Sequence, residues 1–190
     1  MKVSVLLFTL FLITNIGYGQ TQFNKEEAGD ADAQFELGLM YYNGGVGILK
    51  DDKQALYWFN KAALQGNADA QYVLGIMYNY GLGTLKDTKQ VFYWTKKAAE
   101  QGHAEAQFNI GLMYYIGEGT LKDFKQAFYW FKKAAEQGLA GAQYNLGLMY
   151  YMGDGISIDK KQTAYWIKQA YENGHEKAED KWNELELWKY

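Results

Sequence analysis

The chain of 190 residues contains no cysteine, no proline and no arginine. The absence of cysteine excludes a disulfide framework, a zinc–thiolate site and a cysteine nucleophile. The absence of proline means that no residue forces a helix to break. All 19 basic residues are lysines, so the chain lacks the planar fork with which arginine pairs with phosphates and guanine edges. Together with a formal charge of −3, this composition argues against a nucleic-acid partner, and we expect none.

The chain as a whole is 48% hydrophobic, which is enough for one good core and one domain. Its N-terminal residues differ from the rest. A lysine follows the first methionine, residues 3–16 are mostly apolar, and Gly17 and Gly19 are small residues before a possible cleavage point. This pattern is typical of a secretory signal peptide, with an uncleaved anchor as the alternative, because the apolar run is too short to span a membrane. We expect removal of residues 1–19 and an exported bacterial protein, periplasmic or secreted, with no stable membrane anchor.

One unit of sequence recurs four times with a period of about 36 residues. Its members are a tryptophan (58, 94, 130, 166), an Ala-Gln pair (33–34, 70–71, 106–107, 142–143), a glycine (38, 75, 111, 147) and an aspartate (51, 87, 123, 159). An extra glycine in YYNGGVG, residues 41–47, lengthens the interval between the first two copies. A fixed period of this size predicts a repeat architecture filling residues 30–174, with copies at 30–66, 67–102, 103–138 and 139–174.

Each unit is predicted to form two helices. In the third copy, residues 104–116 (AEAQFNIGLMYYI) and 124–137 (FKQAFYWFKKAAEQ) both carry apolar residues at helical spacing. Asp123 precedes the second helix at the place of an N-cap, and Gly138 follows it at the place of a left-handed C-terminal residue. The sequence therefore predicts helix-turn-helix repeats.

The loop GEGTLKD, residues 117–123, raises the alternative of a phosphate- or metal-binding loop. Its counterparts are GVGILKD (45–51), GLGTLKD (81–87) and GDGISID (153–159), so the middle residue is not always acidic. A phosphate loop opens a helix, whereas this Gly-x-Gly ends one. A calcium loop needs several oxygen ligands at alternating positions, which only Asp154 with Asp159 suggests. We favour a turn, with glycines supplying positive φ and aspartate capping the next helix.

The repeat pattern resembles the Sel1-like repeat family, a relative of the tetratricopeptide repeats. The residues that carry the resemblance are AEAQFNIGLMYYIGEGTLKDFKQAFYWFKKAAEQG at 104–138, with Ile110 in place of a leucine. The fourth copy departs from the pattern at Thr163, Ala164 and Tyr171. The resemblance implies an all-α fold, a right-handed α/α superhelical solenoid, that acts as an adaptor or binding scaffold. Some members of the family are tied to envelope processes or host contact in bacteria, and some cysteine-rich relatives are linked to β-lactam binding.

The two ends are predicted to cap the array. If the 36-residue period continues, the buried positions of another first helix fall on Ala178, Trp182 and Leu185. Asn183 then stands in place of the repeated glycine. We expect residues 175–190 to form a C-terminal capping helix with a solvated outer face, because terminal repeats need a polar outer side. Residues 20–29 are expected to form a short N-terminal cap.

No set of residues indicates catalysis. His103 and His175 occupy the same turn between repeats, where the other copies have Asn67 and Leu139. No serine stands near a histidine in a pattern that would activate it, and no pair of carboxylates stands out. We therefore expect no enzyme activity, no cofactor and no bound metal.

A partner is expected to bind where the copies of the first helix vary most. At 100° per residue, the varying positions fall on one stripe of the helix surface, away from the unvarying packing face. The candidate binding residues on this stripe are Glu36, Val73, Tyr80, Asn109, Ile116, Asn145 and Met152. The stripe is interpreted either as ordinary exposed surface or as a concave groove for a protein or peptide.

Two functional classes follow. The favoured class is an exported, monomeric scaffold or adaptor that binds a protein or peptide through the stripe. The alternative is an exported hydrolase of the β-lactamase-like type suggested for some relatives, for which the chain lacks a convergent nucleophile and base.

Overall fold

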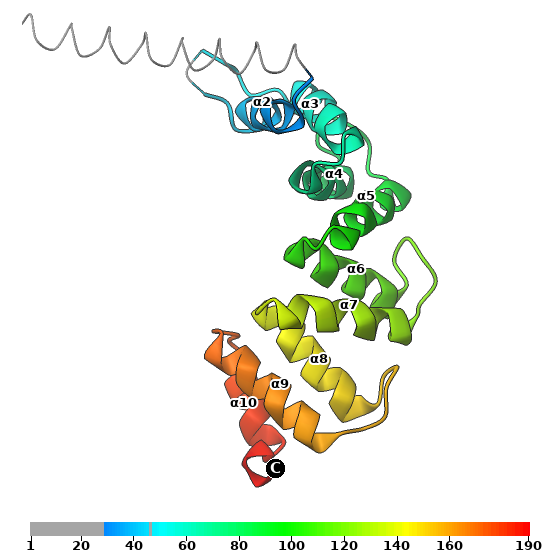
Figure 1. Cartoon of the computed structure of the whole chain (residues 1–190), viewed down its shortest axis with the longest axis vertical. Coiled ribbons are helices and arrows are strands. Elements are labelled where there is room, and N and C mark those ends of the chain that lie inside the picture. Colours follow the sequence, from blue (N-terminus) through cyan, green and yellow to red (C-terminus); the bar gives the residue numbers. More distant parts are fainter. Residues whose placement is uncertain (1–28, 46) are drawn as a thin grey trace, which may run out of the picture. The chain divides into compact units, whose positions relative to one another are not determined.

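The computed structural model describes residues 29–45 and 47–190. Within these residues the chain forms nine α-helices and one short 3-10 helix, with no strand beyond a single bridge between Gly45 and Ile48 (Figure 1). The predicted all-α class is confirmed. The predicted signal peptide and residues 20–28 of the predicted N-terminal cap lie outside the described residues. No helix in the described ranges is both long and apolar enough to cross a membrane.

Each of the four repeats supplies two helices of 13 residues. The first helices are α2 (Ala31–Asn43), α4 (Ala68–Tyr80), α6 (Ala104–Ile116) and α8 (Ala140–Met152). The second helices are α3 (Asp52–Leu64), α5 (Thr88–Glu100), α7 (Phe124–Glu136) and α9 (Lys160–Glu172). The short helix α10 (Ala178–Glu184) and the 3-10 helix η1 (Leu187–Lys189) follow. The predicted helix at 104–116 is confirmed, and the predicted helix at 124–137 ends one residue earlier.

The helices belong to two compact units, which divide after Asp87. In the first unit, α3 packs against both α2 and α4. In the second unit, α6 packs against α5 and α7, α8 packs against α7 and α9, and α10 packs against α9 (Figure 1). Each unit is thus a stack in which a helix contacts its neighbours along the chain, as helix-turn-helix repeats do.

Capping side chains explain where the helices begin. Asp51, Asp123 and Asp159 each accept hydrogen bonds from two backbone N–H groups of the following turn, at 2.9–3.1 Å. Three of the four first helices, α2, α4 and α6, begin with a single side-chain bond, such as that from the Ala106 N–H to His103 Nδ1 at 3.2 Å, while α8 has no side-chain cap. Such bonds satisfy N–H groups that have no partner inside the helix. The predicted cap at Asp123 is confirmed, and His103 is also a capping residue.

The GEGTLKD loop is a turn, as predicted. Gly117 ends α6 in the left-handed conformation, with φ at 82°, and its N–H donates to the carbonyl of Met113. Gly119 also has a positive φ, 69°, and a Cβ there would lie 2.8 Å from the carbonyl oxygen of Thr88 at the start of α5. The first glycine therefore ends a helix, and the second lets the loop pack against the preceding repeat.

Small residues let the helices of one repeat pack closely. A Cβ on Gly38 or Gly111 would lie 2.6–2.8 Å from ring atoms of Phe59 or Phe131, which is closer than real contacts allow. The repeated alanines before the glutamines are at most 2% exposed. These positions are small because a neighbouring helix approaches them closely. Among the repeated tryptophans, Trp94 and Trp130 are buried, while the other two are half-buried.

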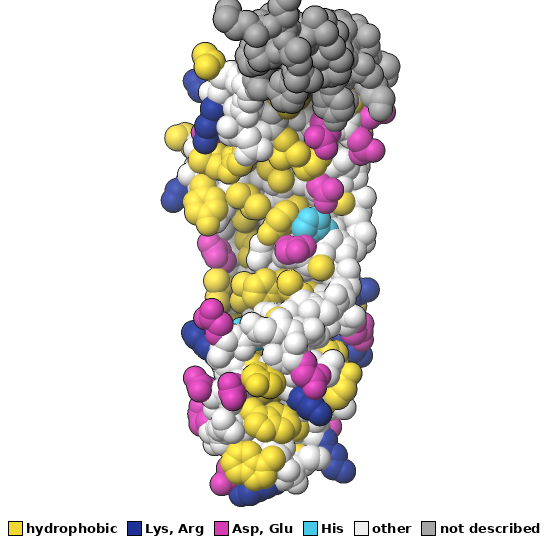
Figure 2. Space-filling view, turned by 90° about the vertical axis from the view of Figure 1, so that its left-hand side faces the viewer, with side chains coloured by type: hydrophobic (Ala, Val, Ile, Leu, Met, Phe, Trp, Pro, Cys, Tyr) yellow, Lys and Arg dark blue, Asp and Glu magenta, His cyan; other side chains and the backbone are white. Residues whose placement is uncertain are grey.

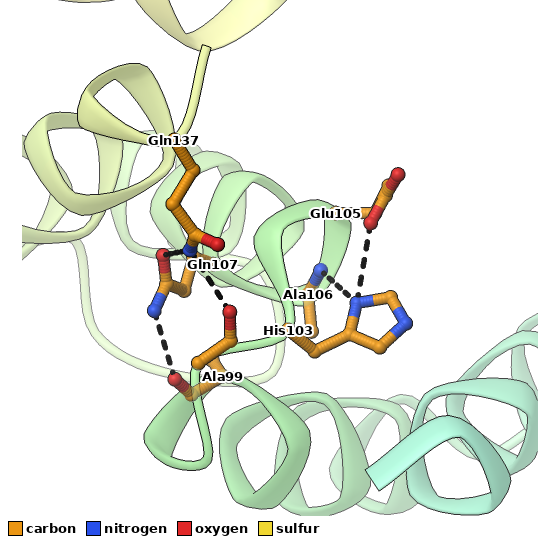
Figure 3. A network of polar contacts seen from close by, with 7 residues as sticks. Ala99, His103, Glu105, Ala106, Gln107 and Gln137 are labelled. Atoms are coloured by element: carbon orange, nitrogen blue, oxygen red, sulfur yellow. Dashed lines mark hydrogen bonds and ion pairs between the residues drawn. The ribbon is translucent and has the colours of Figure 1, made fainter. Parts of the chain in front are cut away.

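Each repeat buries a glutamine, and in three of the repeats its side chain donates to the end of the preceding repeat. Gln107 is 4% exposed, and its Nε2 donates to the carbonyl of Ala99 in the preceding repeat at 3.2 Å. Its Oε1 accepts from Gln137 Nε2 at 2.8 Å, beyond the end of α7, and Gln137 Nε2 also lies 2.9 Å from the carbonyl of Gly102 (Figure 3). The same donation links Gln71 to Ala63 and Gln143 to Ala135. The nitrogen and the oxygen of the Gln107 amide both have hydrogen-bond partners. A buried amide bonded in this way specifies how one repeat joins the next.

The C-terminal cap is present but differs from its prediction. Helix α10 has seven residues instead of the 13 of a first helix. Ala178 is fully buried as predicted, Trp182 and Leu185 are half-buried, and Leu187 in η1 is 2% exposed. The outer face is less polar than predicted, because the C-terminal aromatic side chains at 188 and 190 are 57% and 52% exposed.

Candidate functional site

The predicted stripe divides between the two units. Glu36, Val73 and Tyr80 belong to the first unit, and Asn109, Ile116, Asn145 and Met152 belong to the second. The stripe residues at the C-terminal ends of α4, α6 and α8 are exposed, with Tyr80, Ile116 and Met152 at 64%, 60% and 47%. Val73 and the two asparagines are half-buried, and Glu36 is exposed. Large apolar side chains at these exposures are available for contact with another molecule.

A hollow of about 180 Å³ opens beside the stripe in the second unit, where α6 and α8 flank α7. We call it the α6–α8 pocket. It is lined by Leu112, Tyr115, Phe131, Asn145, Leu148, Met149 and Met152. Two of these residues, Asn145 and Met152, were predicted as binding residues, whereas Asn109 and Ile116 do not line the pocket. The lining is apolar apart from the Asn145 amide and the Tyr115 hydroxyl.

Tyr115 is held in place by a carboxylate of the next repeat. Its hydroxyl donates to Asp154 Oδ2 at 2.8 Å, and Asp154 is the middle residue of the last Gly-x-Gly loop. Burial raises the pKa of Tyr115, and the hydrogen bond and negative charge of Asp154 raise it further. The phenol therefore stays neutral and keeps donating, which fixes one wall of the pocket. In the loop at 153–159, Asp154 thus holds the side chain of Tyr115 in position.

Three of the pocket-lining residues that the sequence did not single out, Leu112, Leu148 and Met149, stand at positions that scarcely vary among the copies. Leu112 and Leu148 have leucine or isoleucine counterparts in the other copies, Leu39 and Ile76, and a search for varying positions passes over them. Both leucines are half-buried and pack against the hydrophobic core, which variation among the copies does not reveal. The bond between Tyr115 and Asp154 joins residues 39 apart, so only the stacking of repeats brings them together.

Charge is distributed unequally between the two kinds of helix. The first helices contain four acidic residues, Asp32, Glu36, Asp69 and Glu105, and no lysine. Lysines occur on the second helices, including adjacent pairs on α5, α7 and α9. On the face drawn in Figure 2, hydrophobic side chains are exposed with acidic ones between them, and lysines lie mostly near the margins. The first helices thus offer apolar and acidic side chains and no lysine.

The two histidines have separate structural roles. His103 caps α6, with Glu105 Oε2 3.4 Å from its Nδ1 (Figure 3). His175 stacks on Tyr144, with ring centroids 4.2 Å apart and planes at 16°. Among the described residues, no group of three or more histidine, aspartate or glutamate side chains is arranged to hold a metal ion.

Repeated 13-residue helix pairs, a buried glutamine at each junction and close-packed glycines define an α/α solenoid of helix-turn-helix repeats. A model of the Sel1 repeat matches the chain four times, at residues 31–67, 68–103, 104–139 and 140–175. The chain therefore belongs to the Sel1 repeat family.

Two solved structures share this fold at substantial identity. A protective antigen of uropathogenic Escherichia coli strains with an SLR fold is 41% identical, with a TM-score of 0.77, over 82% of this chain and 33% of that one. A Sel1 repeat protein from Oxalobacter formigenes is 37% identical, with a TM-score of 0.79, over 84% of this chain and 46% of that one. The matched region therefore spans less than half of either protein.

Shorter matches occur to two curated proteins of Arabidopsis thaliana. The ERAD-associated E3 ubiquitin-protein ligase components HRD3A and HRD3B are 37% identical over 51 residues and 43% identical over 42 residues. These segments are 27% and 22% of this chain but only 8% and 7% of the relatives. The similarity therefore covers a small part of those proteins.

Proposed function

We propose that the chain is an exported scaffold that binds a protein or peptide through the stripe residues of the second unit, with the α6–α8 pocket receiving one apolar side chain of the partner. The observation that carries the proposal is the pocket itself, a hollow of about 180 Å³ with apolar walls. Sites for drug-sized ligands are larger, about 300–1,000 Å³, while an apolar cavity of about 150 Å³ is enough for benzene. The size therefore fits one aliphatic or aromatic side chain.

Asn145 gives the pocket a group that can pair with a peptide backbone. An amide offers both a donor and an acceptor, which match the C=O and N–H of an extended chain. No hydrogen bond of the Asn145 side chain occurs within the described part of the molecule, so its amide is available. Met149 and Met152 line the same pocket, and methionine adapts its shape to different apolar partners.

The relatives support a role in assembly with other proteins. HRD3A and HRD3B are named as components of a ubiquitin ligase, and the Escherichia coli relative is described as a protective antigen. A component works by contacting other proteins, and an antigen that protects must be accessible to the immune system. The first comparison favours a binding scaffold, and the second favours export.

The test is capture of a partner followed by measurement of affinity with variants. Immobilised protein would first be exposed to envelope extracts, and the captured partner then purified. We expect Asn145→Ala and Met152→Ala each to weaken its binding about 5- to 30-fold, as loss of 1–2 kcal/mol at an interface does. The double variant Asn109→Ala, Asn145→Ala should weaken binding at least as much. Circular dichroism of each variant checks that the helices are intact.

Lys132→Ala is the matched control. Lys132 is an exposed residue of α7, and its ammonium lies 3.8 Å from Glu136 Oε1. Such a surface ion pair contributes little to stability. Its loss should leave affinity unchanged. Normal binding by the stripe variants together with lost capture by Lys132→Ala would assign the interface to the second helices instead.

Export is the second part of the proposal and has its own test. The apolar run followed by Gly17 and Gly19 supports cleavage after residue 19. Mass spectrometry of the protein recovered from periplasm or medium should find Gln20 at its N-terminus. An intact Met1 in membrane fractions would show retention as an anchor.

A further inference from the structure

A second hollow, of about 270 Å³, lies at the C-terminal end of the second unit, between α9 and α10. We call it the cap pocket. It is lined by Lys168, Tyr171 and Glu172 of α9 and by Glu179, Trp182 and Asn183 of α10. Exposed hydrophobic side chains with charged ones beside them gather at the lower end of the face in Figure 2, the end at which Figure 1 draws α9 and α10.

The cap pocket arises from substitutions at positions that close the junctions between internal repeats. At those junctions a glutamine donates its Nε2 hydrogen to the carbonyl of an alanine eight residues earlier, as Gln143 does to Ala135 at 3.2 Å. At the cap the corresponding residues are Glu179 and Tyr171. A carboxylate has no hydrogen to donate to a carbonyl, and a tyrosine is much larger than an alanine. The cap helix therefore does not close against α9 as an internal helix does.

The side chain of Asn183 also lines the cap pocket. In internal repeats the position of Asn183 is a glycine, because a side chain of the repeat's own second helix packs there, as Ile167 does within 2.9 Å of a Cβ built on Gly147. At the cap this position is Asn183, whose amide is exposed. Asn183 thus adds a polar group to the rim.

Aromatic and acidic groups face this hollow together. Tyr171 is 51% exposed and Trp182 is half-buried, and their rings make no contact with each other in the described structure. Glu172 already accepts from Gln169 at 2.8 Å and lies 3.8 Å from Lys168. Glu179 has neither a hydrogen bond nor an ion pair within the described residues. The hollow therefore combines two separated rings with one uncompensated carboxylate.

We propose that the cap pocket binds an arginine side chain of a partner polypeptide. A guanidinium is planar and weakly hydrated, so it stacks on an aromatic ring and pairs with a carboxylate through two parallel N–H bonds. Its apolar stem lies against Tyr171 and Trp182, while its charged end meets Glu179. The positive charge of Lys168 is partly neutralised by its ion pair with Glu172. This site is separate from the α6–α8 pocket and goes beyond the proposed function.

The test uses two capped tripeptides, acetyl-Gly-Arg-Gly-amide and the same peptide with citrulline. Citrulline has nearly the shape of arginine but no charge, so the comparison isolates the cation. The indole N–H signal of Trp182, assigned by loss in Trp182→Phe, reports binding in two-dimensional NMR spectra of the purified protein. We expect the arginine peptide to shift this signal and to bind about tenfold more tightly than the citrulline peptide.

Variants separate the charge from the shape. Glu179→Ala should reduce binding of the arginine peptide to the level of the citrulline peptide, and Glu179→Asp should retain a preference for arginine. Glutamine is unsuitable at this position because it would restore the donor that closes internal junctions. Glu136→Gln is the control, since Glu136 is the counterpart of Glu172 on α7 and lies outside the pocket. Equal binding of the two peptides, no shift of Trp182 at millimolar peptide, or full binding by Glu179→Ala would each overturn the proposal.

Discussion

Asp123 and Glu118 stand five residues apart in one loop but differ in what their carboxylates do. Asp123 Oδ1 accepts from the N–H groups of Lys125 and Gln126 at 2.9 and 3.0 Å, whereas Glu118 is exposed. We expect Asp123→Ala to lower the free energy of unfolding by about 1 kcal/mol, because two N–H groups lose their cap. Glu118→Ala should change it by less than about 0.5 kcal/mol. Urea unfolding of both variants measures the difference, and equal effects would contradict the capping role.

His175 should make the C-terminal cap sensitive to acid. Its Nδ1 is buried without a hydrogen-bond partner in the described residues, and its ring stacks on Tyr144. Burial lowers the pKa of His175 below 6.5, the charge of Lys177 adds to this, and Glu176 opposes it. Because the folded pKa lies below the unfolded one, the unfolded chain binds the proton more readily. Its contribution to stability is therefore complete above pH 6.5 and is lost as the pH falls through the folded pKa.

The variant His175→Phe isolates this effect, since it keeps an aromatic ring on Tyr144 and removes the titrating group. Unfolding of the wild type and the variant would be followed at several pH values from 8 to 5. The wild type should lose more stability than the variant on acidification below pH 6.5. Parallel pH profiles would show that other groups, such as the carboxylates, account for the whole dependence.

At the scale of the element, replacing two glycines of the first helices by alanine should have opposite effects on stability. A Cβ on Gly111 in α6 would lie 2.7 Å from a ring atom of Phe131, while a Cβ on Gly141 in α8 would lie 3.4 Å from Phe108, an ordinary contact. Overpacking costs about 1–3 kcal/mol, and alanine gains up to about 1 kcal/mol of helix propensity over glycine. Gly111→Ala should therefore destabilise the protein, and Gly141→Ala should stabilise it by up to about 1 kcal/mol. Paired thermal melts test this, and a stabilised Gly111→Ala would show that α7 can move away.

The helices could be predicted from the sequence because each one is marked locally. Asp123 and its counterparts mark the starts, and Gly117 and Gly138, both with positive φ, mark the ends. The period of the repeated tryptophans then sets which helices are equivalent. Capping and backbone conformation are decided within a few residues, so no knowledge of distant contacts is needed.

The candidate site could be predicted only in part because it depends on contacts between repeats. Variation among the copies identified Asn145 and Met152, but Leu112 and Leu148 line the same pocket at a position that holds only leucine or isoleucine. The Tyr115–Asp154 bond and the open junction beside Tyr171 follow from how successive repeats stack. A pattern in one copy carries no information about that stacking.

At the scale of the whole molecule, stability should be distributed along the chain. Within each unit every helix packs mainly against its immediate neighbours, so the fold is a sum of local interfaces. Trp130 in α7 is 6% exposed, and removing a large buried aromatic side chain costs about 3–5 kcal/mol. We expect Trp130→Ala to loosen α7 and the helices that pack on it, α6 and α8.

Hydrogen–deuterium exchange read helix by helix tests this expectation. In Trp130→Ala the amides of α6, α7 and α8 should lose most of their protection, while those of α2 and α3 keep theirs, because no interface of those helices has changed. Lys132→Ala, a surface change on the same helix, should leave the whole profile as in the wild type. A uniform loss of protection in every helix would show that the chain unfolds as one cooperative body, since nearest-neighbour coupling strong enough to link all repeats would transmit the damage to α2.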